Sequence, residues 1–359
     1  MKLRIFNPEH DIALQANDIH FTAPHAGRKL RGDLDFLPAL WADEGDFVLV
    51  GDVERAQRSL RCYSKYLHHR VRFVDSSMLR SLDFTGIAPW GWDLALWGEL
   101  GRLGVAEARM PSHSQLAAIR DLSNRGWAAE HLLPALQTDG TVGQAFIAHT
   151  LAEVKDLFRR FGSLVVKAPW SSSGRGVRYV LPDSWDDRLE GWVRNVLQRQ
   201  LTVEVEPLYN NVKDFALEFF ADESGVRFVG YSLFHTTHGA YTGNVLATRE
   251  AKEAMLSRYL PIEVVQSTAT RICQVLSESL RDAYRGPLGV DMMVVAGQGK
   301  LLLHPCVELN LRRTMGHVGL SLSPTEREPW RLMRVLFQNG RYHFRVTDIH
   351  ENVLDRDVY

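Results

Sequence analysis

Short apolar runs that alternate with helical segments fill the first 110 residues, and this alternation limits the possible folds more than any other feature of the sequence. Residues 3–6, 47–50 and 71–74 predict buried strands, and residues 33–41 predict a helix between the first two. Strands that alternate with helices are typical of a parallel sheet covered by helices. We therefore expect an α/β domain over residues 1–110.

From residue 163 onward the pattern changes to strands joined by short turns. Residues 164–167 and 177–181 predict one hairpin, and residues 289–295 and 301–311 predict another around a glycine-containing turn. Short turns join antiparallel strands. The predicted fold is therefore α/β and α+β, with an N-terminal parallel α/β domain at 1–110, a domain rich in antiparallel sheets at 111–338 and a C-terminal tail at 339–359.

Composition excludes several classes of protein. The chain has 42 Lys+Arg and 43 Asp+Glu, which is too balanced for a strongly basic nucleic-acid scaffold. No apolar run reaches the ~18 residues of a membrane span, and residues 1–10 lack the apolar stretch of a secretory signal. The three cysteines are widely separated and fit no metal-binding spacing. We expect a cytoplasmic protein that binds neither nucleic acid nor membrane.

A serine- and glycine-rich turn follows Lys167, which ends a predicted strand. Three serines and two glycines in residues 169–176 leave little side-chain bulk, so backbone N–H groups can approach an anion closely. Lys167 adds a positive charge for phosphate oxygens. The turn matches neither the Walker A loop nor the dinucleotide-binding fingerprint. Taken alone, it fits an ordinary flexible hairpin slightly better.

Acidic residues occupy the predicted hairpin near the C-terminus. Asp291 lies in the middle of an apolar strand, where an unpaired carboxylate is costly. Residues two apart in a strand face the same side, so Glu308 and Asn310 are expected to present their oxygens together, beside Asp291. Such oxygens suit Mg²⁺. The alternative is a structural ion pair between Asp291 and Arg312 or Arg313.

The order of these motifs resembles the ATP-grasp superfamily, which includes D-alanine–D-alanine ligase, glutathione synthetase and biotin carboxylase. The matching elements are Val166-Lys167, the Ser/Gly turn, Glu204 to Leu208, Gly289-Val290-Asp291 and Glu308-Leu309-Asn310-Leu311-Arg312. The resemblance covers residues 112–337, and the N-terminal α/β region fits the domain that usually precedes this fold. The Glu-x-Asn-x-Arg element and its distance from Gly-Val-Asp are its most specific part.

The resemblance implies roles for individual residues. ATP would be bound by Lys167 at the α- and β-phosphates, by Ser172, Ser173, Gly174 and Gly176 as a mobile cover, by Glu206 and Leu208 at the adenine edge, and by Asp214 near the ribose. Mg²⁺ would be held by Asp291, Glu308 and Asn310. The catalytic residues would be Lys167, Arg312 and Arg313, with Arg312 facing the transferred phosphoryl group.

The sequence departs from the family pattern in three places. The interval from Asp291 to Glu308 is longer than usual and contains Pro305, which predicts an edge strand or a bulge. Members usually carry a lysine on a helix before the glycine loop, and here Arg125 is the candidate replacement. The hinge reads Glu206-Pro207-Leu208, where two successive acidic residues are common.

The resemblance implies an ATP- and Mg-dependent, ADP-forming ligase. Such an enzyme joins a small-molecule carboxylate to an amine through an acyl-phosphate intermediate, mainly by positioning reactants and stabilising charge. Two alternatives stay open. One is an ATP-grasp phosphotransferase that acts on a hydroxyl group. The other is a non-catalytic nucleotide-binding protein.

Several other segments carry weaker signals. Asn7-Pro8-Glu9 resembles a helix cap with proline in the first turn. Glu9, His10 and Asp11 could then meet a substrate, although a solvated helix start is the favoured interpretation. Trp90 and Trp92 fit a substrate pocket or a core cap equally well. Cys306 is interpreted as a buried structural thiol.

Residues 235–244 are the most lid-like stretch after the Ser/Gly turn. They combine Gly239 and Gly243 with small polar residues, and glycine permits the dihedral changes of a closing loop. We expect Tyr241 to cover the closed site, and a static hairpin is nearly as good an interpretation. His235 and His238 have a zinc-compatible spacing but no further ligand, so polar loop residues are favoured.

Overall fold

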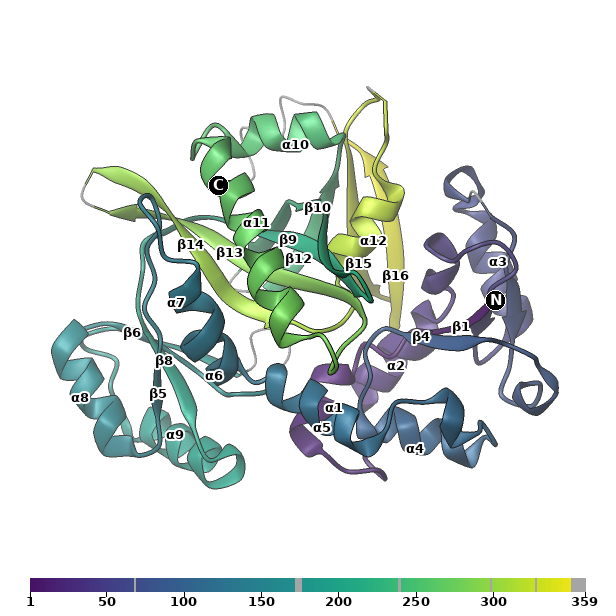
Figure 1. The fold of residues 1–359 in the computed structure, drawn as a ribbon, viewed down its shortest axis with the longest axis horizontal. Helices are drawn as coiled ribbons and strands as arrows, with labels where there is room; N and C mark the ends of the chain where they lie inside the picture. Colours follow the sequence, from purple (N-terminus) through teal and green to yellow (C-terminus); the bar gives the residue numbers. More distant parts are fainter. Residues whose placement is uncertain (68, 172–175, 238–239, 298, 327, 350–359) are drawn as a thin grey trace. The chain divides into compact units, whose positions relative to one another are not determined.

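The computed structural model describes residues 1–67, 69–171, 176–237, 240–297, 299–326 and 328–349, without the side chains of 235–242 (Figure 1). The chain forms two compact units that interleave along the sequence. Unit 1 comprises 1–119, 242–248 and 312–359, and unit 2 comprises 120–241 and 249–311. The sequence-based division at 110 and 338 separates contiguous segments instead, so it assigns residues 312–338 to a different part than their packing does.

Unit 1 contains a parallel sheet, a group of antiparallel strands and short helices. Its strands are β1 (Lys2–Ile5), β2 (Phe47–Leu49), β3 (Arg72–Val74), β4 (Gly86–Pro89), β12 (Ala240–Leu246), β15 (Arg331–Gln338) and β16 (Arg341–Asp348). Its helices are α1 (His10–Ala16), α2 (His25–Leu34), η1 (Leu37–Leu40), α3 (Val53–Arg61), η2 (Ser64–Tyr66), η3 (Leu79–Ser81), α4 (Leu94–Arg102), η4 (Glu107–Arg109), α5 (His113–Leu122) and α12 (Met315–Leu322). β12 and α5 extend across the boundary between the units.

Unit 2 contains two four-stranded sheets and the longer helices. Its strands are β5 (Phe146–Ala148), β6 (Leu164–Lys167), β7 (Val177–Val180), β8 (Val203–Pro207), β9 (Asn211–Asp222), β10 (Gly225–Ser232), β11 (Phe234–Thr237), β13 (Gly286–Gly297) and β14 (Lys300–Asn310). Its helices are α6 (Arg125–Trp127), η5 (Ala128–Leu132), α7 (Leu133–Ala135), α8 (Leu151–Phe161), α9 (Asp187–Gln200), α10 (Arg249–Leu256) and α11 (Ile262–Ser279). None of the helices in the described part of the chain is long and apolar enough to span a membrane.

The parallel sheet of unit 1 confirms the α/β prediction for the N-terminal region. Its order is β3-β2-β1-β4, and every neighbouring pair is parallel. β4 was not expected, because glycine and proline at its ends weaken a strand signal. The helix predicted over residues 33–41 is wrong in its bounds. α2 ends at Leu34, and a separate 3₁₀ turn follows in which Pro38 cannot donate a backbone hydrogen bond.

The segment predicted as a C-terminal tail belongs to the core of unit 1 as far as residue 348. β16 pairs along its whole length with β15, which in turn pairs with β12. The Tyr342 amide donates to Asp33 Oδ2 at 2.9 Å, and the Tyr63 hydroxyl donates to the Phe344 carbonyl oxygen. Phe344 is buried in the same apolar cluster as Phe36 and Tyr63. Residues 341–348 are therefore a structural strand.

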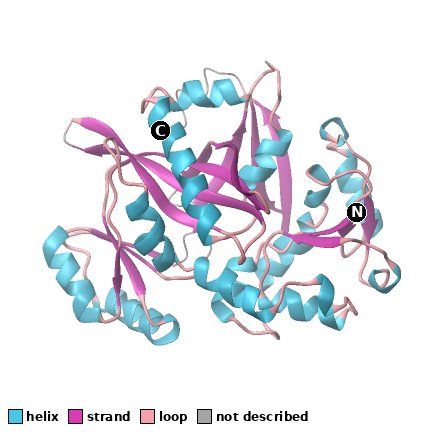
Figure 2. Ribbon diagram, in the orientation of Figure 1, coloured by secondary structure: helices cyan, strands magenta, loops and turns pink. Residues whose placement is uncertain are grey.

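The first sheet of unit 2 has one apolar face and one charged face. Its order is β5-β8-β6-β7, and helices α8 and α9 cover it (Figure 2). β8 begins Val203-Glu204-Val205-Glu206, and its valines pack against these helices. Because side chains alternate between the faces of a strand, both glutamates lie on the opposite face. Lys167, which follows the buried Val166 on β6, shares that face.

The second sheet of unit 2 confirms the predicted hairpin. Its order is β10-β9-β13-β14, so β14 is an edge strand, and β13 and β14 are antiparallel. The pairing is regular except between Asp291 and Met293, which lie opposite Glu308 and His304. Two extra residues therefore bulge from β14 in the stretch that contains Pro305. Proline at an edge and at a bulge matches its lack of a backbone donor.

Candidate functional site

Lys167 lies at the centre of a buried ionic cluster in unit 2. Its ammonium group contacts Glu206 Oε1 at 2.7 Å, Glu204 Oε1 at 3.0 Å and the Val307 carbonyl oxygen at 3.2 Å. All three charged side chains are almost completely buried. The contact with Val307 brings the end of β6 beside the residue that precedes Glu308 on β14. The sequence motif includes Glu204, but no role was predicted for it, although the alternation of valine and glutamate in β8 was the available signal.

One lysine between two carboxylates sets the protonation of the cluster. Burial lowers the pKa of Lys167, but Glu204 and Glu206 outweigh it and hold that pKa above its usual range. Burial raises the pKa of Glu204 to about 7, against the opposing effect of Lys167. Burial and the Lys167 charge lower the pKa of nearby His304 to about 3. His304 is therefore neutral near pH 7, and among the described residues neither of its ring nitrogens has a hydrogen-bond partner.

Arg125 connects the Ser/Gly turn to Glu308. It begins α6, where Asn124 caps the helix by accepting from the Gly126 amide. Its guanidinium group donates to the Ala168 carbonyl oxygen and to Ser171 Oγ, both at 2.7 Å, and to Glu308 Oε1 at 2.6 Å. The side chain is buried. Arg125 thus orients Glu308, and its replacement of the usual family lysine stays a prediction.

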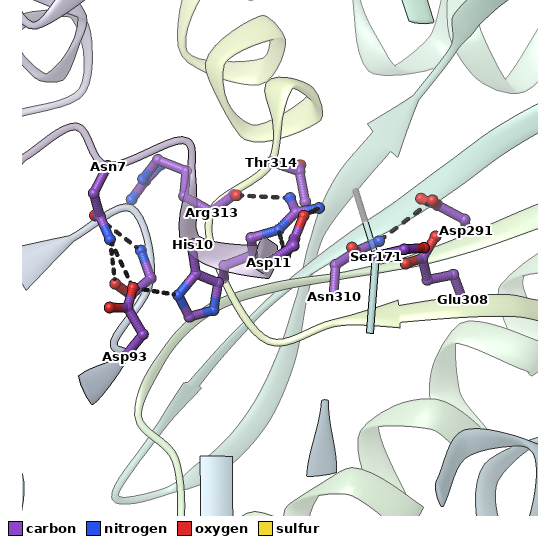
Figure 3. Close-up of polar contacts among 12 residues, drawn as sticks. Asn7, His10, Asp11, Asp93, Ser171, Asp291, Glu308, Asn310, Arg313 and Thr314 are labelled. Atoms are coloured by element: carbon purple, nitrogen blue, oxygen red, sulfur yellow. Dashed lines mark hydrogen bonds and ion pairs between the residues drawn. The ribbon is translucent and has the colours of Figure 1, made fainter. Parts of the chain in front are cut away.

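The oxygen-bearing residues of the β13–β14 hairpin meet across the strand pair. Asp291 lies directly opposite Glu308 in the register. Asn310 Nδ2 donates to Asp291 Oδ2 at 3.3 Å, as the dashed line in Figure 3 shows. Glu308 keeps 29% of its side-chain surface exposed, so a ligand can reach its carboxylate. Two carboxylates and an amide oxygen are the donor chemistry that Mg²⁺ requires, and these residues therefore fit that ion.

A small cavity separates Arg125 from Glu206. Its volume is about 10 Å³, and its other walls are formed by Ala128, Ala129, Leu133, Ala145, Glu204, Cys306, Val307 and Glu308. A single water needs about this much space. Burial raises the pKa of the Cys306 thiol well above its usual range, in agreement with its interpretation as a buried structural thiol.

The loop after Lys167 is closed at its base. The Ala168 amide donates to the Gly176 carbonyl oxygen at 2.8 Å. A Cβ atom on residue 176 would come within 2.3 Å of Ser171 Oγ, so only glycine fits at this closure. The predicted phosphate-covering residues Ser172, Ser173 and Gly174 lie outside the described residues, and their role stays a prediction.

Two residues predicted near the nucleotide already make contacts within unit 2. The Leu208 amide, at the predicted hinge, donates to the Ser163 carbonyl oxygen at 3.0 Å. Asp214, on β9, accepts from Asn211 Nδ2 at 2.8 Å. The Leu208 amide is thus engaged in the fold. A contact between Leu208 and an adenine edge would need its carbonyl oxygen or a rearranged hinge.

Arg312 and Arg313 belong to unit 1. Arg312 Nε and one terminal nitrogen donate to the two oxygens of Asp11 at 2.7 and 2.9 Å, which is a bidentate pair. The guanidinium group of Arg313 stacks 4.8 Å from the ring centre of Trp41, and its amide donates to the Trp90 carbonyl oxygen at 2.8 Å. Both arginines are held in place, and their catalytic role stays a prediction.

The Asn7–Asp11 segment is a built network and not a solvated helix start. α1 begins at His10, so the expected cap at Asn7 is wrong. Asn7 instead donates to the Gly91 carbonyl oxygen at 2.8 Å, and His10 Nδ1 lies 3.1 Å from Asp93 Oδ2 (Figure 3). Any Cβ on Gly91 would approach the His10 ring within 2.6 Å. This network ties together the loops that follow β1 and β4.

A larger cavity lies in unit 1 beside this network. It has a volume of about 480 Å³. Its walls include residues that follow each of the four parallel strands, namely Asn7, Gly51, Ser76 and Asp93. Carboxylates and arginines in or directly beside α1, α2 and α4 also line it, namely Glu9, Arg28, Arg31, Asp35, Glu99 and Arg102. Trp90 and Trp92 were expected either to line a substrate pocket or to cap the core. Trp90 packs edge-on against Phe6 in the core, in agreement with the second interpretation.

Residues 235–244 run mostly in strands β11 and β12. His238, Gly239 and the side chains of His235 and Tyr241 lie outside what the structure describes, so the zinc and lid interpretations stay untested. Among the described residues, no group of three or more His, Cys, Asp or Glu side chains could hold a metal ion. The Asp291–Glu308–Asn310 set has two such residues and an amide.

Comparison with known sequences gave no match. No protein-family model matches the chain. A search of curated proteins likewise found nothing similar to it.

Comparison with solved structures gave clear matches of fold. The chain superimposes on the ADP complex of N5-carboxyaminoimidazole synthetase from Staphylococcus aureus with a TM-score of 0.52 and 14% identity, over 94% of this chain and 83% of that one. It matches the biotin carboxylase domain of 2-oxoglutarate carboxylase from Hydrogenobacter thermophilus with a TM-score of 0.55 and 11% identity, over 93% of this chain and 74% of that one.

Phosphoribosylamine–glycine ligase from Thermotoga maritima also matches, with a TM-score of 0.50 and 12% identity over 98% of this chain and 90% of that one. All three are ATP-grasp enzymes. At these identities the likeness concerns the fold. It agrees with the motif order that pointed to the same superfamily, and the fold of this chain is the ATP-grasp fold.

Proposed function

We propose that the protein is an ATP- and Mg-dependent ligase that joins a carboxylate to an amine and releases ADP. The observation that carries this proposal is the arrangement in unit 2. There, Lys167 and the oxygen set of Asp291, Glu308 and Asn310 are joined through neighbouring contacts on β14. A fold alone carries no function, whereas such a site does. We further propose that the enzyme acts in the cytoplasm.

The similar structures support the choice of nucleotide. The Staphylococcus aureus synthetase was solved with ADP, and the Hydrogenobacter thermophilus carboxylase domain with MgADP and bicarbonate. Biotin carboxylase from Campylobacter jejuni, at a TM-score of 0.50 and 14% identity, is described as a complex with β,γ-ATP. We extend ATP and Mg²⁺ to this chain on that basis and on the chemistry of its own residues.

The residues of unit 2 have separate tasks in this proposal. The ammonium group of Lys167 would neutralise phosphate oxygens, and its buried position would strengthen that attraction. Asp291, Glu308 and Asn310 would hold Mg²⁺, which neutralises charge on the transferring phosphoryl group. Arg125 would keep Glu308 in one orientation through its 2.6 Å contact. No side chain needs to become a covalent intermediate.

The reaction balances without any further reactant. A carboxylate oxygen attacks the γ-phosphorus of ATP, the bond to the bridging oxygen breaks, and ADP leaves. The neutral amine then attacks the acyl carbon, phosphate leaves, and the nitrogen loses a proton to give the amide. Positioning and charge stabilisation account for catalysis in such steps.

The test is an ADP-release assay with Mg²⁺ over a panel of carboxylates and amines, repeated with hydroxylamine as the acceptor. Formation of a hydroxamate from the active carboxylate supports an acyl phosphate and the ligase proposal. ADP release with a phosphorylated hydroxyl product and no hydroxamate would favour the phosphotransferase instead. Nucleotide binding without turnover across the panel would favour a binding protein.

The matched pair of variants for this assay is Asp291→Asn and Glu54→Gln. Asp291→Asn keeps the shape of the side chain and removes a charge from the oxygen set, so it should lower ADP release. Glu54 is a highly exposed residue of α3 in unit 1, and Glu54→Gln should leave the rate unchanged. ADP release that survives Asp291→Asn unchanged would point to a contaminating ATPase and would overturn the assignment of this site.

A further inference from the structure

The cavity of unit 1 lies where open α/β sheets bind their ligands. Asn7, Gly51, Ser76 and Asp93, which follow β1, β2, β3 and β4, all contribute to its walls. The sheet order β3-β2-β1-β4 reverses its direction of growth between β1 and β4. Ligands in such folds bind outside the carboxyl ends of the strands at this kind of reversal. A volume of about 480 Å³ suits a small molecule.

Two buried carboxylates in this cavity each have one oxygen without a partner among the described residues. Asp35 accepts from the Gly51 amide and from Arg55 through Oδ2, but Oδ1 has no hydrogen-bond partner. Glu9 accepts from Arg31 through Oε1, but Oε2 has none. Only 6% of the Asp35 side chain and 11% of the Glu9 side chain are exposed. Buried acceptors without partners are rare, and these two lack donors.

The charges on the inner wall do not balance. Arg31 is shared between Glu9 and Glu99, with contacts of 2.9 Å to each, so one cation faces two carboxylates. Burial raises the pKa of both Glu9 and Asp35, and it outweighs the opposing effects of Arg31 on Glu9 and of the Gly51 amide and Arg55 on Asp35. A ligand with N–H donors and a positive charge would satisfy both needs at once.

Two exposed arginines also line the cavity. Arg28 and Arg102 donate from their guanidinium groups to the main-chain carbonyl oxygens of Ala23 and Ile19, respectively. Their charges are therefore available to an anionic group in the cavity. Buried acidic groups and exposed basic groups in one cavity match a molecule that carries an ammonium and a carboxylate.

We propose that this cavity binds an amino acid, with its ammonium group beside Glu9 and Asp35 and its carboxylate beside Arg28 and Arg102. The binding needs only residues of unit 1. If the bound amino acid is also the amine that the ligase joins to the carboxylate, that further step rests on the proposed ligase function. The amine substrate is then an amino acid. Binding is therefore measured without nucleotide, so that a failed ligase assay and a failed binding assay give different results.

The experiment screens the twenty proteinogenic amino acids against the full chain by saturation-transfer NMR. The strongest binder is then compared with its decarboxylated amine and its deaminated acid. We expect the amino acid to bind at least 10-fold more tightly than either analogue. Glu9→Gln and Asp35→Asn turn the unpaired oxygen into an N–H donor, and each should weaken binding at least 10-fold. Glu54→Gln, on the surface of unit 1, should leave it unchanged.

Several outcomes would overturn the proposal. One is the absence of binding by every amino acid, which would leave water as the partner of these oxygens. Another is equal binding of the deaminated acid, which would show that no ammonium is recognised. A third is undiminished binding in both Glu9→Gln and Asp35→Asn. Circular dichroism of each variant separates lost binding from lost folding, and Arg102→Gln tests the carboxylate end independently.

Discussion

The two units solve the problem of buried charge in opposite ways. In unit 2, the Lys167 ammonium group is saturated by Glu204, Glu206 and the Val307 carbonyl oxygen, and the adjoining cavity measures about 10 Å³. In unit 1, Glu9 and Asp35 each keep an oxygen without a partner among the described residues, beside a cavity of about 480 Å³. The charged groups of unit 2 therefore have all their partners within the protein. The two carboxylates of unit 1 each keep an oxygen that can accept a hydrogen bond from a ligand.

The two sites differ in how many existing contacts a ligand would have to replace. A nucleotide phosphate at Lys167 must compete with contacts that already exist, and the cavity beside Glu206 must widen to admit a base. An amino acid in unit 1 would add contacts and displace few. Ligand binding in unit 2 is therefore expected to be coupled to local rearrangement, whereas unit 1 is preformed.

The largest expected effect comes from breaking the saturated cluster. Lys167→Met leaves Glu204 and Glu206 buried without their cation, so we expect the free energy of unfolding to fall by about 3–5 kcal/mol. Urea denaturation measures this loss. Adding Glu204→Gln and Glu206→Gln to the same variant should recover most of the stability. A loss under ~1 kcal/mol for Lys167→Met would show that the cluster is not what stabilises unit 2.

The second prediction concerns the carboxylates of Asp291 and Glu308, which we expect to be needed for catalysis and not for folding. Asp291→Asn and Glu308→Gln should each lower turnover at least 100-fold, equivalent to about 3 kcal/mol, because Mg²⁺ prefers carboxylate oxygens. Thermal stability should change little, because the amide oxygen of each variant can accept the same hydrogen bond, from Arg125 in Glu308→Gln and from Asn310 in Asp291→Asn. Parallel melting curves and ADP-release rates test this. Variants that melt early while their folded fraction stays active would support a structural ion pair instead.

The third prediction uses the pH dependence of stability. Burial raises the pKa of Glu204 from 4.5 to about 7, so between these values the folded state holds a proton that the unfolded state has released. The free energy of unfolding therefore falls as pH rises through this window. Glu204→Gln should remove about 1–2 kcal/mol of that fall, which is less than the full shift would give because Glu204 interacts strongly with Lys167 and Glu206.

Urea denaturation of the unchanged protein and of Glu204→Gln at about pH 4.5 and pH 7, the two ends of that window, measures the effect of Glu204 on the pH dependence of stability. Glu9 and Asp35 in unit 1 also have raised pKa values and contribute a slope of the same sign. They are present in both proteins, so only the difference between the two slopes reports on Glu204. Identical slopes would mean that Glu204 titrates normally in the folded state.

The smallest effect is expected in unit 1. Arg31→Met removes the cation shared by Glu9 and Glu99, yet 25% of the Arg31 side chain is exposed and 36% of Glu99 is too. Solvent screens the Arg31–Glu99 pair, and the buried Glu9 can take up a proton because its pKa is already raised, so we expect a loss of about 1 kcal/mol. The comparison fails if this variant is as unstable as Lys167→Met under the same urea protocol.

Local patterns were sufficient to predict the parts of the fold that depend on neighbouring residues. The alternation of strands and helices predicted the parallel sheet. The pattern of Ser112 and Gln115, three residues apart, is that of a capping box, and both reciprocal hydrogen bonds are present, while Thr150 caps α8. Pro305 predicted the edge strand and its bulge. In each case the signal lies within a few residues of the structure that it predicts.

Long-range partners could not be read from the sequence. Arg312 binds Asp11 across 301 positions, and Lys167 binds Glu204 across 37. Nothing in the local pattern of either residue specifies its partner, because the choice depends on how distant strands align. The interleaved units have the same origin, since β12 leaves one segment of the chain to pair with β15 in another.

The bulge in β14 has a consequence for how this hairpin can change in length. Between the pairs Asp291–Glu308 and Met293–His304, β14 holds two residues more than β13. Directly opposed residues of an antiparallel pair share one face of the sheet, so the pair Asp291–Glu308 fixes the face of Glu308 whatever number of residues the bulge holds. The bulge can therefore absorb a change in chain length within residues 305–307 without moving the oxygen set. An insertion or deletion between Glu308 and Asn310 has no such outlet, and it would turn Asn310 to the other face.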